Sequence, residues 1–177
     1  MLILGLNHGI DAGAALVEDG RVLAAVNEER LNRKKMFWGP PRLALAEVLR
    51  VADVDPAKID HVAQSSLTGG GGVHEQFLEP PPIKRAVERL SQLPFSHSHL
   101  VKRAYRALAG VRRDDPVVDA RLNELGVRAP KRYIEHHLCH AATAYYGSPF
   151  GDRPEDVLVV TADGVGDGVC HSISTVD

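Results

Sequence analysis

The first 28 residues consist of strand-like runs joined by short turns, and this feature constrains the fold most. Met1–Leu6 and Ala12–Glu18 are apolar runs, Asp19-Gly20 is a hairpin signal, and Arg21–Asn27 resumes the apolar pattern. Consecutive strands without an intervening helix form an antiparallel meander. The chain therefore starts with antiparallel strands, which excludes a purely doubly wound sheet.

A helix and a further strand follow this meander. Pro40-Pro41 precedes a segment with apolar residues at helical spacing, running from Leu43 to Ala52. His61–Gln64 is then a short strand. Strands followed by a helix and another strand indicate an α/β protein with a mixed sheet.

The remaining sequence outside the middle of the chain predicts six more elements. In chain order they are a helix from Asp115-Pro116 to Gly126, a short strand at Tyr133–Glu135, a helix at His140–Tyr146, a buried strand at Val157–Ala162, a turn at Asp163–Gly168 and a strand at Val169–Val176. The last strand has no following element to cover its edge, so we expect a partner chain or the rest of a longer fold beside it.

The middle of the chain combines a break with a basic segment. Residues 68–82 hold four consecutive glycines and three consecutive prolines, which predicts a flexible loop, either a substrate loop or a surface insertion. Residues 83–110 indicate two helices separated near Pro94. Between Lys84 and Arg113 there are eight basic residues and one acidic residue, which form either a surface for an anionic ligand or a solvated helical face.

Composition limits the classes of protein that remain. The chain has 177 residues, 44% apolar and 25% charged, which is typical of one globular domain. Its 21 basic and 23 acidic residues give no overall attraction to nucleic acid or to an anionic membrane. Two cysteines make no disulfide framework, and the apolar start is too short for a signal peptide or membrane span. We therefore expect a cytoplasmic protein.

Three of the nine histidines, His136, His137 and His140, fall within five residues. If this segment is helical, His136 and His140 lie one turn apart and can bind one transition-metal ion through their ring nitrogens. His137 and His140 are a second pairing, and histidines satisfied by hydrogen bonds at a helix end are the alternative. The H-E-x-x-H pattern of metalloproteases is absent.

Asp163-Gly164-Val165-Gly166-Asp167-Gly168 directly follows a predicted strand. Asp163 can supply the oxygen ligand that the histidine pair lacks. The exposed amides of Gly164 and Gly166 can bind a nucleotide phosphate. The alternative is an ordinary hairpin turn, because aspartate and glycine are common turn formers.

Two further segments near the amino terminus carry polar groups. The turn from Asn7 to Asp11 can approach a phosphate or a metal-bound water, or it is a plain hairpin loop. Arg33, Lys34 and Lys35 form a cationic cluster that can neutralise phosphate charge, or they are a solvated loop.

Together, and in this order, these segments resemble the amino-terminal part of the O-carbamoyltransferase family. That family includes nodulation-factor and antibiotic carbamoyltransferases, and its domain is related to the tRNA threonylcarbamoyl transferase. The segments that carry the resemblance are Ile3–Asn7, Asp11–Val17, Asp19–Val22, Glu28–Arg30, Arg33–Lys35, His136–Ala142, Tyr145–Phe150 and Asp163–Asp167. The resemblance extends from residue 1 to residue 177 and is weak in the middle third.

The resemblance implies an RNase H-like fold of the actin and sugar kinase superfamily, of which residues 1–177 are an incomplete half. It implies carbamoyl transfer to a hydroxyl of a small molecule from a carbamoyl-adenylate, which a second domain makes from carbamoyl phosphate and ATP with magnesium. The implied metal is Fe(II) or another divalent transition metal, bound by His136, His140 and Asp163. Arg33 and Lys35 would lie near the phosphate or carbamoyl group, and Asn7 and Asp11 in the substrate site.

The sequence departs from the family in two ways. Ile10 stands where relatives have a histidine before the aspartate, and His8 is the available substitute. Relatives are also much longer, so we expect this chain to carry half of the site. His137 is the candidate general base, because an imidazole titrates near neutral pH. Two alternatives stay open: a non-catalytic fragment or subunit that needs a partner half, and a sugar-kinase-like phosphotransferase.

Overall fold

The computed structural model describes residues 1–67, 115–152, 155–167 and 169–176. Its centre is a mixed five-stranded sheet in the order β4-β3-β1-β6-β7. β1 (Leu2–Asn7), β3 (Gly13–Glu18) and β4 (Arg21–Asn27) pair antiparallel, which confirms the predicted meander. β6 (His61–Ser65) and β7 (Lys131–Ile134) continue the sheet in parallel. The predicted loop 68–82, the helices at 83–110 and the basic segment lie outside the described residues.

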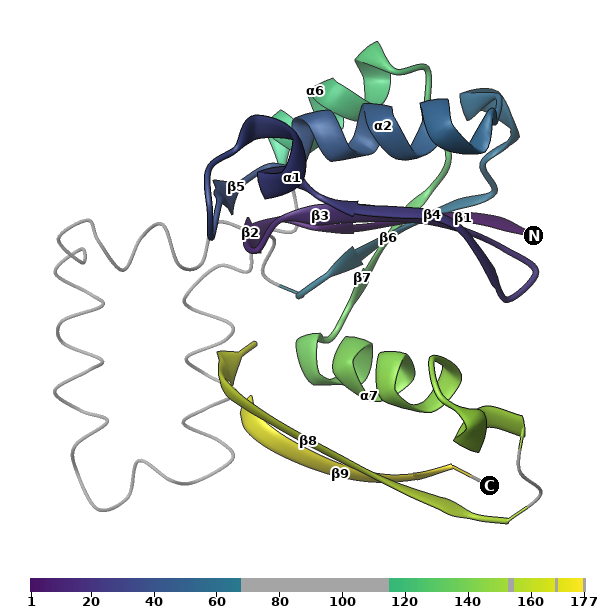
Figure 1. Cartoon of the computed structure of the whole chain (residues 1–177), viewed down its shortest axis with the longest axis vertical. Coiled ribbons are helices and arrows are strands. Elements are labelled where there is room, and N and C mark those ends of the chain that lie inside the picture. Colours follow the sequence, from purple (N-terminus) through teal and green to yellow (C-terminus); the bar gives the residue numbers. More distant parts are fainter. Residues whose placement is uncertain (68–114, 153–154, 168, 177) are drawn as a thin grey trace, which may run out of the picture.

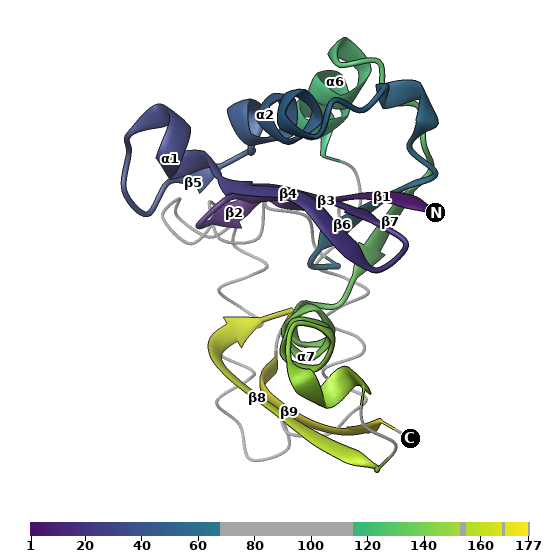
Figure 2. The same cartoon turned by 45° about the vertical axis from the view of Figure 1, so that its right-hand side comes forward.

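One face of this sheet is covered by helices. α2 (Arg42–Ala52) and α6 (Pro116–Glu124) lie side by side on it in both views (Figures 1 and 2). Side chains alternate between the two faces of a strand, so Leu2, Leu4 and Leu6 of β1 all point to the helices and are buried. The predicted helix starts are correct, because Pro116 follows the capping residue Asp115 and α2 begins after Pro41.

The opposite face of the sheet has small side chains in register across four strands. Gly5 of β1 pairs with Ala15 of β3 and Ala63 of β6, and Ala15 pairs with Ala25 of β4. Cross-strand partners share a face. This face therefore has a floor, formed by Gly5, Ala15, Ala25 and Ala63, that rises little above the backbone.

Three short elements between β1 and α2 were not predicted. β2 (Gly9–Ile10) pairs with β5 (Trp38–Gly39), and α1 (Glu28–Asn32) directly follows β4. Elements this short are below the length at which periodicity is visible. The remaining short elements are the 3-10 helices η1 (Pro56–Lys58) and η2 (Pro149–Asp152).

A second layer lies on the side of the sheet away from α2 and α6 (Figures 1 and 2). It consists of α7 (His136–Tyr146), which packs against a hairpin of β8 (Val157–Gly166) and β9 (Val169–Val176). α7 begins four residues before the predicted start. β8 continues through the predicted turn to Gly166, where the ladder resumes opposite Val169 after a shift in register.

Val157–Ala162 is a strand, as predicted, but its predicted burial holds for one face only. Val159 and Thr161 point to α7 and are buried, but Leu158 and Val160 are each 62% exposed. Among the described residues, only one face of this hairpin is covered.

A helix that spans a membrane must be both long and apolar. None of the helices among the described residues is both long enough and apolar enough to span a lipid bilayer.

Candidate metal centre

The amino terminus of α7 places two histidines on one helix face. The Glu135 side chain accepts a hydrogen bond from the Leu138 amide, and this cap starts the helix at His136. Residues four apart lie above one another on a helix, so His136 and His140 project the same way. Their Nε2 atoms are 3.0 Å apart.

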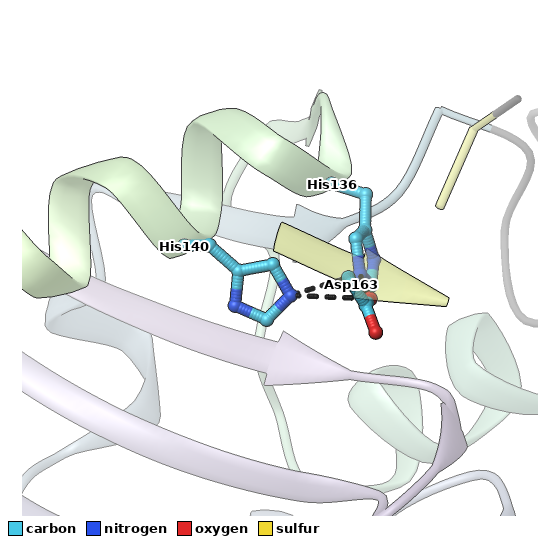
Figure 3. A group of neighbouring side chains, drawn as sticks. All are labelled: His136, His140 and Asp163. Atoms are coloured by element: carbon cyan, nitrogen blue, oxygen red, sulfur yellow. Dashed lines mark hydrogen bonds and ion pairs between the residues drawn. The ribbon is translucent and has the colours of Figure 1, made fainter. Parts of the chain in front are cut away.

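Asp163 of β8 completes a group of three potential ligands (Figure 3). Its Oδ2 atom lies 2.7 Å from Nε2 of His136 and 3.5 Å from Nε2 of His140. Ligand atoms bound about 2.1 Å from one ion lie roughly 3 Å from each other. Two imidazole nitrogens and one carboxylate oxygen at these separations fit a single divalent transition metal.

The group is partly open to solvent, so a bound ion would keep positions for other ligands. His140 and Asp163 are exposed and His136 is partly buried. The hydrogen bond from His136, together with one from the Gly164 amide, lowers the pKa of the Asp163 carboxyl below its usual value. The carboxylate form, which binds metal ions, is therefore favoured at neutral pH.

The shift in register within the hairpin brings Asp163 to this position. Regular pairing stops at Ala162 and resumes at Gly166, so Asp163 lies in the interrupted stretch. Gly166 is buried against the His136 ring, and a methyl group built there would overlap the ring atoms. Close packing therefore requires a glycine at this position, and its predicted contact with a nucleotide stays a prediction. Gly164 has open space around it, and its contact with a nucleotide stays a prediction.

His137 occupies a different environment from the other two histidines. Its side chain is 1% exposed, Nδ1 lies 2.6 Å from Oγ1 of Thr161, and Nε2 lies 2.9 Å from the carbonyl oxygen of Val169. Thr161 is also 2.7 Å from the hydroxyl of Ser172. Both ring nitrogens are thus engaged inside the protein, which fits an anchor between α7 and the hairpin better than the predicted general base.

A groove of about 670 Å³ opens on the face with the small residues. Gly5, Ala15, Ala25 and Ala63 form its floor. Its polar walls come from several elements, namely Asn7, Asp11, Asn27, Arg30 and Ser65. Cys139 of α7, next to His140 in the chain, also lines the groove.

Two of the predicted substrate residues are in this groove. The Asn7 amide donates to the carbonyl oxygen of Ile10 and accepts from the Ser65 hydroxyl, which fixes the side chain at the end of β1. Asp11 has a positive φ of 52° in the following turn. His8, the suggested substitute for the missing histidine, instead pairs with Asp115 and is not part of the groove lining.

The predicted cationic residues Arg33 and Lys35 are exposed and do not line the groove, whereas Arg30 does. Arg33 ends α1 with a left-handed backbone at φ 61°. The denser charge cluster three residues later, Arg33–Lys35, is the stronger local signal in the sequence. Arg30 belongs to the Glu28–Arg30 segment that carries the resemblance, but no role in the site was predicted for it.

Cys139 is a further groove residue that spacing did not reveal. Burial and the nearby negative charge of Glu135 raise the pKa of its thiol. It therefore contributes a neutral thiol to the groove wall at neutral pH. Cys139 and Cys170 are both free.

The fold and the site define an α/β protein with a mixed sheet, a polar groove and a candidate His₂Asp metal centre. The chain belongs to the carbamoyltransferase family, because the family described as Carbamoyltransferase N-terminus matches residues 2–177.

The chain is also similar to proteins from bacteria and from an archaeon. The chain is 31% identical over 188 residues to nodulation protein NolNO of Sinorhizobium fredii, covering 94% of this chain and 24% of the relative. It is 29% identical over 176 residues to the uncharacterized protein sll1178 of Synechocystis sp., covering 97% and 26%. A match to the uncharacterized protein MJ1058 of Methanocaldococcus jannaschii is 48% identical over 62 residues, covering 29% and 10%. The chain thus spans about a quarter of the length of the first two relatives.

Proposed function

We propose that this chain is the amino-terminal part of an O-carbamoyltransferase. In this proposal the carbamoyl group moves from a carbamoyl-adenylate to a hydroxyl of a small molecule. The observation that carries the proposal is the convergence of His136, His140 and Asp163 in a chain of the carbamoyltransferase family. The sheet order supports an RNase H-like half, since three antiparallel strands are followed by two parallel ones.

The metal ligands in this proposal are His136, His140 and Asp163, and Fe(II) or a similar divalent ion is the metal. When bound, such an ion polarises a carbonyl oxygen and stabilises negative charge that develops on it. The donor set supports this assignment, because imidazole and carboxylate together suit first-row transition metals.

The groove is the proposed site for the rest of the reactants. Asn7 and Ser65 present fixed polar groups, Asp11 an acceptor and Arg30 a positive charge. A flat floor of glycine and alanine lets a ligand approach the sheet closely. Arg33, Lys35 and the amide of Gly164 remain proposed phosphate contacts at the edges of the site. We propose that ATP with magnesium and carbamoyl phosphate are used elsewhere in the whole protein to make the carbamoyl-adenylate.

We do not keep His137 as the base in this mechanism. A general base must reach the proton it removes, and the two ring nitrogens of His137 bond to Thr161 and Val169 inside the protein. We propose instead that His137 orients α7 against the hairpin. Asp11 is the described carboxylate in the groove lining and is our candidate for accepting the proton of the acceptor hydroxyl.

The test is metal content and carbamoyl transfer in the full-length protein with both His136→Ala and His140→Ala. We expect the double variant to lose the bound metal and the transfer of carbamoyl groups to a hydroxyl acceptor. His171→Ala is the matched control, because His171 is exposed and pairs with Ala162 on the hairpin face away from α7. Unchanged metal content in the double variant would disprove the site.

Two other hypotheses predict different results in the same assays. A subunit that needs a partner half would bind metal or ligand only after the partner is added. A sugar-kinase-like phosphotransferase would hydrolyse ATP in the presence of a sugar and transfer no carbamoyl group. Among the described residues, the paired imidazoles favour the carbamoyltransferase over the kinase. The cytoplasmic location stays a prediction.

A further inference from the structure

The carboxylate of Asp167 connects three segments that are far apart in the sequence. Its Oδ1 accepts a hydrogen bond from the Ser66 hydroxyl at 2.7 Å. Its Oδ2 accepts from the amide of Leu67 and from the amide of His136, both at 2.9 Å. Ser66 and Leu67 follow β6 of the five-stranded sheet, and His136 is the first residue of α7.

Asp167 belongs to the same hairpin as Asp163, which makes these bonds relevant to the candidate metal centre. Asp167 directly follows Gly166 in the chain, and the His136 ring packs against the backbone of Gly166. Hydrogen bonds to a charged acceptor are stronger than those between neutral groups. The hairpin thus fixes His136 twice, through its ring at Gly166 and through its backbone amide at Asp167.

We propose that Asp167 is a positioning residue for metal binding, which sets the location of His136 relative to Asp163. This inference rests on the proposed metal centre. Without the Asp167 carboxylate, the first residue of α7 loses its backbone attachment to the hairpin, while His137 still holds the next residue. We expect the ligand atoms of His136 and Asp163 to be held less firmly at their present separation. Groups that orient metal ligands typically change metal affinity by about 10- to 100-fold when they are removed.

Glu135 separates this role from ordinary helix capping. Its carboxylate accepts from Leu138 within α7, so it stabilises the same helix end without bonding the hairpin or β6. Both carboxylates also place one negative charge near the same histidines. A variant of Glu135 therefore controls for helix stability and for charge, and leaves the connection between elements in place.

The experiment measures binding of Co²⁺ to the full-length protein, using the visible spectrum of the bound ion as a probe of its ligands. Asp167→Gly is the test variant, because glycine accepts the positive φ of 51° at this position. We expect its Co²⁺ affinity to fall by about tenfold or more, with a changed spectrum. Asp167→Asn keeps an acceptor oxygen and should restore most of the affinity. Glu135→Ala, which removes both the helix cap and the charge, should bind Co²⁺ nearly as well as the unsubstituted protein.

Hydrogen exchange of the metal-free protein provides a second readout. The His136 amide should exchange faster in Asp167→Gly and stay protected in Glu135→Ala. If Asp167→Gly does not fold, Ser66→Gly serves as the second variant, because it removes one bond to the carboxylate and suits the φ of 80°. We expect a smaller loss of affinity there.

The outcomes separate this inference from the proposed function. The double variant His136→Ala with His140→Ala gives the baseline, that is, the Co²⁺ affinity of a protein without the two histidine ligands. If the unsubstituted protein binds Co²⁺ no better than that variant, the metal centre and this inference both fail. The other case is that the unsubstituted protein binds Co²⁺ better than the double variant. If Asp167→Gly then binds as well as the unsubstituted protein, with the same spectrum, only the role of Asp167 is disproved. The same holds for Ser66→Gly if that variant has to take the place of Asp167→Gly.

Discussion

The imidazole of His136 lies directly on the backbone of Gly166, with no room for a side chain between them. This contact joins the first residue of α7 to the point where β8 and β9 resume pairing. It explains why glycine is needed at this position in physical terms, since any Cβ atom would displace the ring that faces Asp163.

We predict that Gly166→Ala weakens metal binding by at least about tenfold, because the displaced His136 ring no longer reaches the position beside Asp163. Gly164→Ala is the matched control, since a Cβ there would meet nothing within 4 Å. Isothermal titration of both variants with Co²⁺ checks this. Equal affinity in the two variants would contradict the close contact.

The second prediction concerns Glu28, a buried carboxylate that is 3% exposed. It accepts hydrogen bonds from the amides of Leu43 and Ala44, the first turn of α2, where Pro41 provides no side-chain cap. Glu28→Ala leaves these amides without their acceptor and should lower the free energy of unfolding by about 1–3 kcal/mol. Urea denaturation measures this change.

Glu47→Ala is the control for that experiment. Glu47 pairs with Arg50 on the surface of α2 at 2.7 Å, and exposed ion pairs contribute little to stability. We expect no measurable change in its unfolding midpoint. A similar loss in both variants would show that Glu28 acts through helix charge and not through its hydrogen bonds.

The third prediction concerns stability in acid. Burial alone would raise the pKa of the Asp115 carboxyl, but the hydrogen bonds from His8 and from the Val118 amide outweigh burial and lower it below 3.8. A carboxyl whose pKa is lower in the folded than in the unfolded state stabilises the folded protein at pH values above the unfolded-state pKa. That contribution is lost as the pH falls from about 3.8 through the folded value.

The unfolding free energy should therefore fall less steeply in this acid range for Asp115→Asn than for the unsubstituted protein. The asparagine keeps an oxygen to cap α6, so the difference reports on the charge. Asp55→Asn, at the exposed cap of η1, should follow the unsubstituted protein. Parallel curves for the Asp115 variant and the unsubstituted protein would contradict the lowered pKa.

The fourth prediction tests the anchoring role of His137. His137→Phe removes both hydrogen bonds and leaves the Thr161 hydroxyl and the Val169 carbonyl without this partner. We expect a loss of about 1–3 kcal/mol in the free energy of unfolding, since buried polar groups are destabilising when unpaired. Restored stability in the double variant with Thr161→Val would support the pairing, and an unchanged midpoint in His137→Phe would contradict it.

Sequence patterns predicted the strands and helices whose signals are local. The alternation of Leu2, Leu4 and Leu6 and the turn at Asp19-Gly20 define the meander, and Asp115-Pro116 marks the start of α6. The start of α7 was missed because histidine is a weak helix former, and its first amide bonds to the distant Asp167. That bond joins residues 31 positions apart and leaves no local pattern.

The ligand residues of the candidate metal centre were predictable from the sequence, but the residues that hold them in place were not. The spacing of His136 and His140 shows that they share a helix face, and the position of Asp163 directly after a predicted strand marks it as an oxygen ligand, which the resemblance also implies. The packing of Gly166 under His136 depends on the register shift in the hairpin, which turn residues alone do not reveal. The burial of His137 depends on Thr161, whose inward direction follows only from the β8 register.

The floor of small residues across β4, β3, β1 and β6 has a consequence for selectivity. A molecule resting on Gly5, Ala15, Ala25 and Ala63 meets almost nothing but main chain there, so this surface cannot tell one flat ligand from another. If the proposed acceptor binds in this groove, discrimination falls to the side chains around the floor, which among the described residues include Asn7, Asp11, Asn27, Arg30, Ser65 and Cys139. Exchanging these side chains is then the direct way to change which ligands the groove admits.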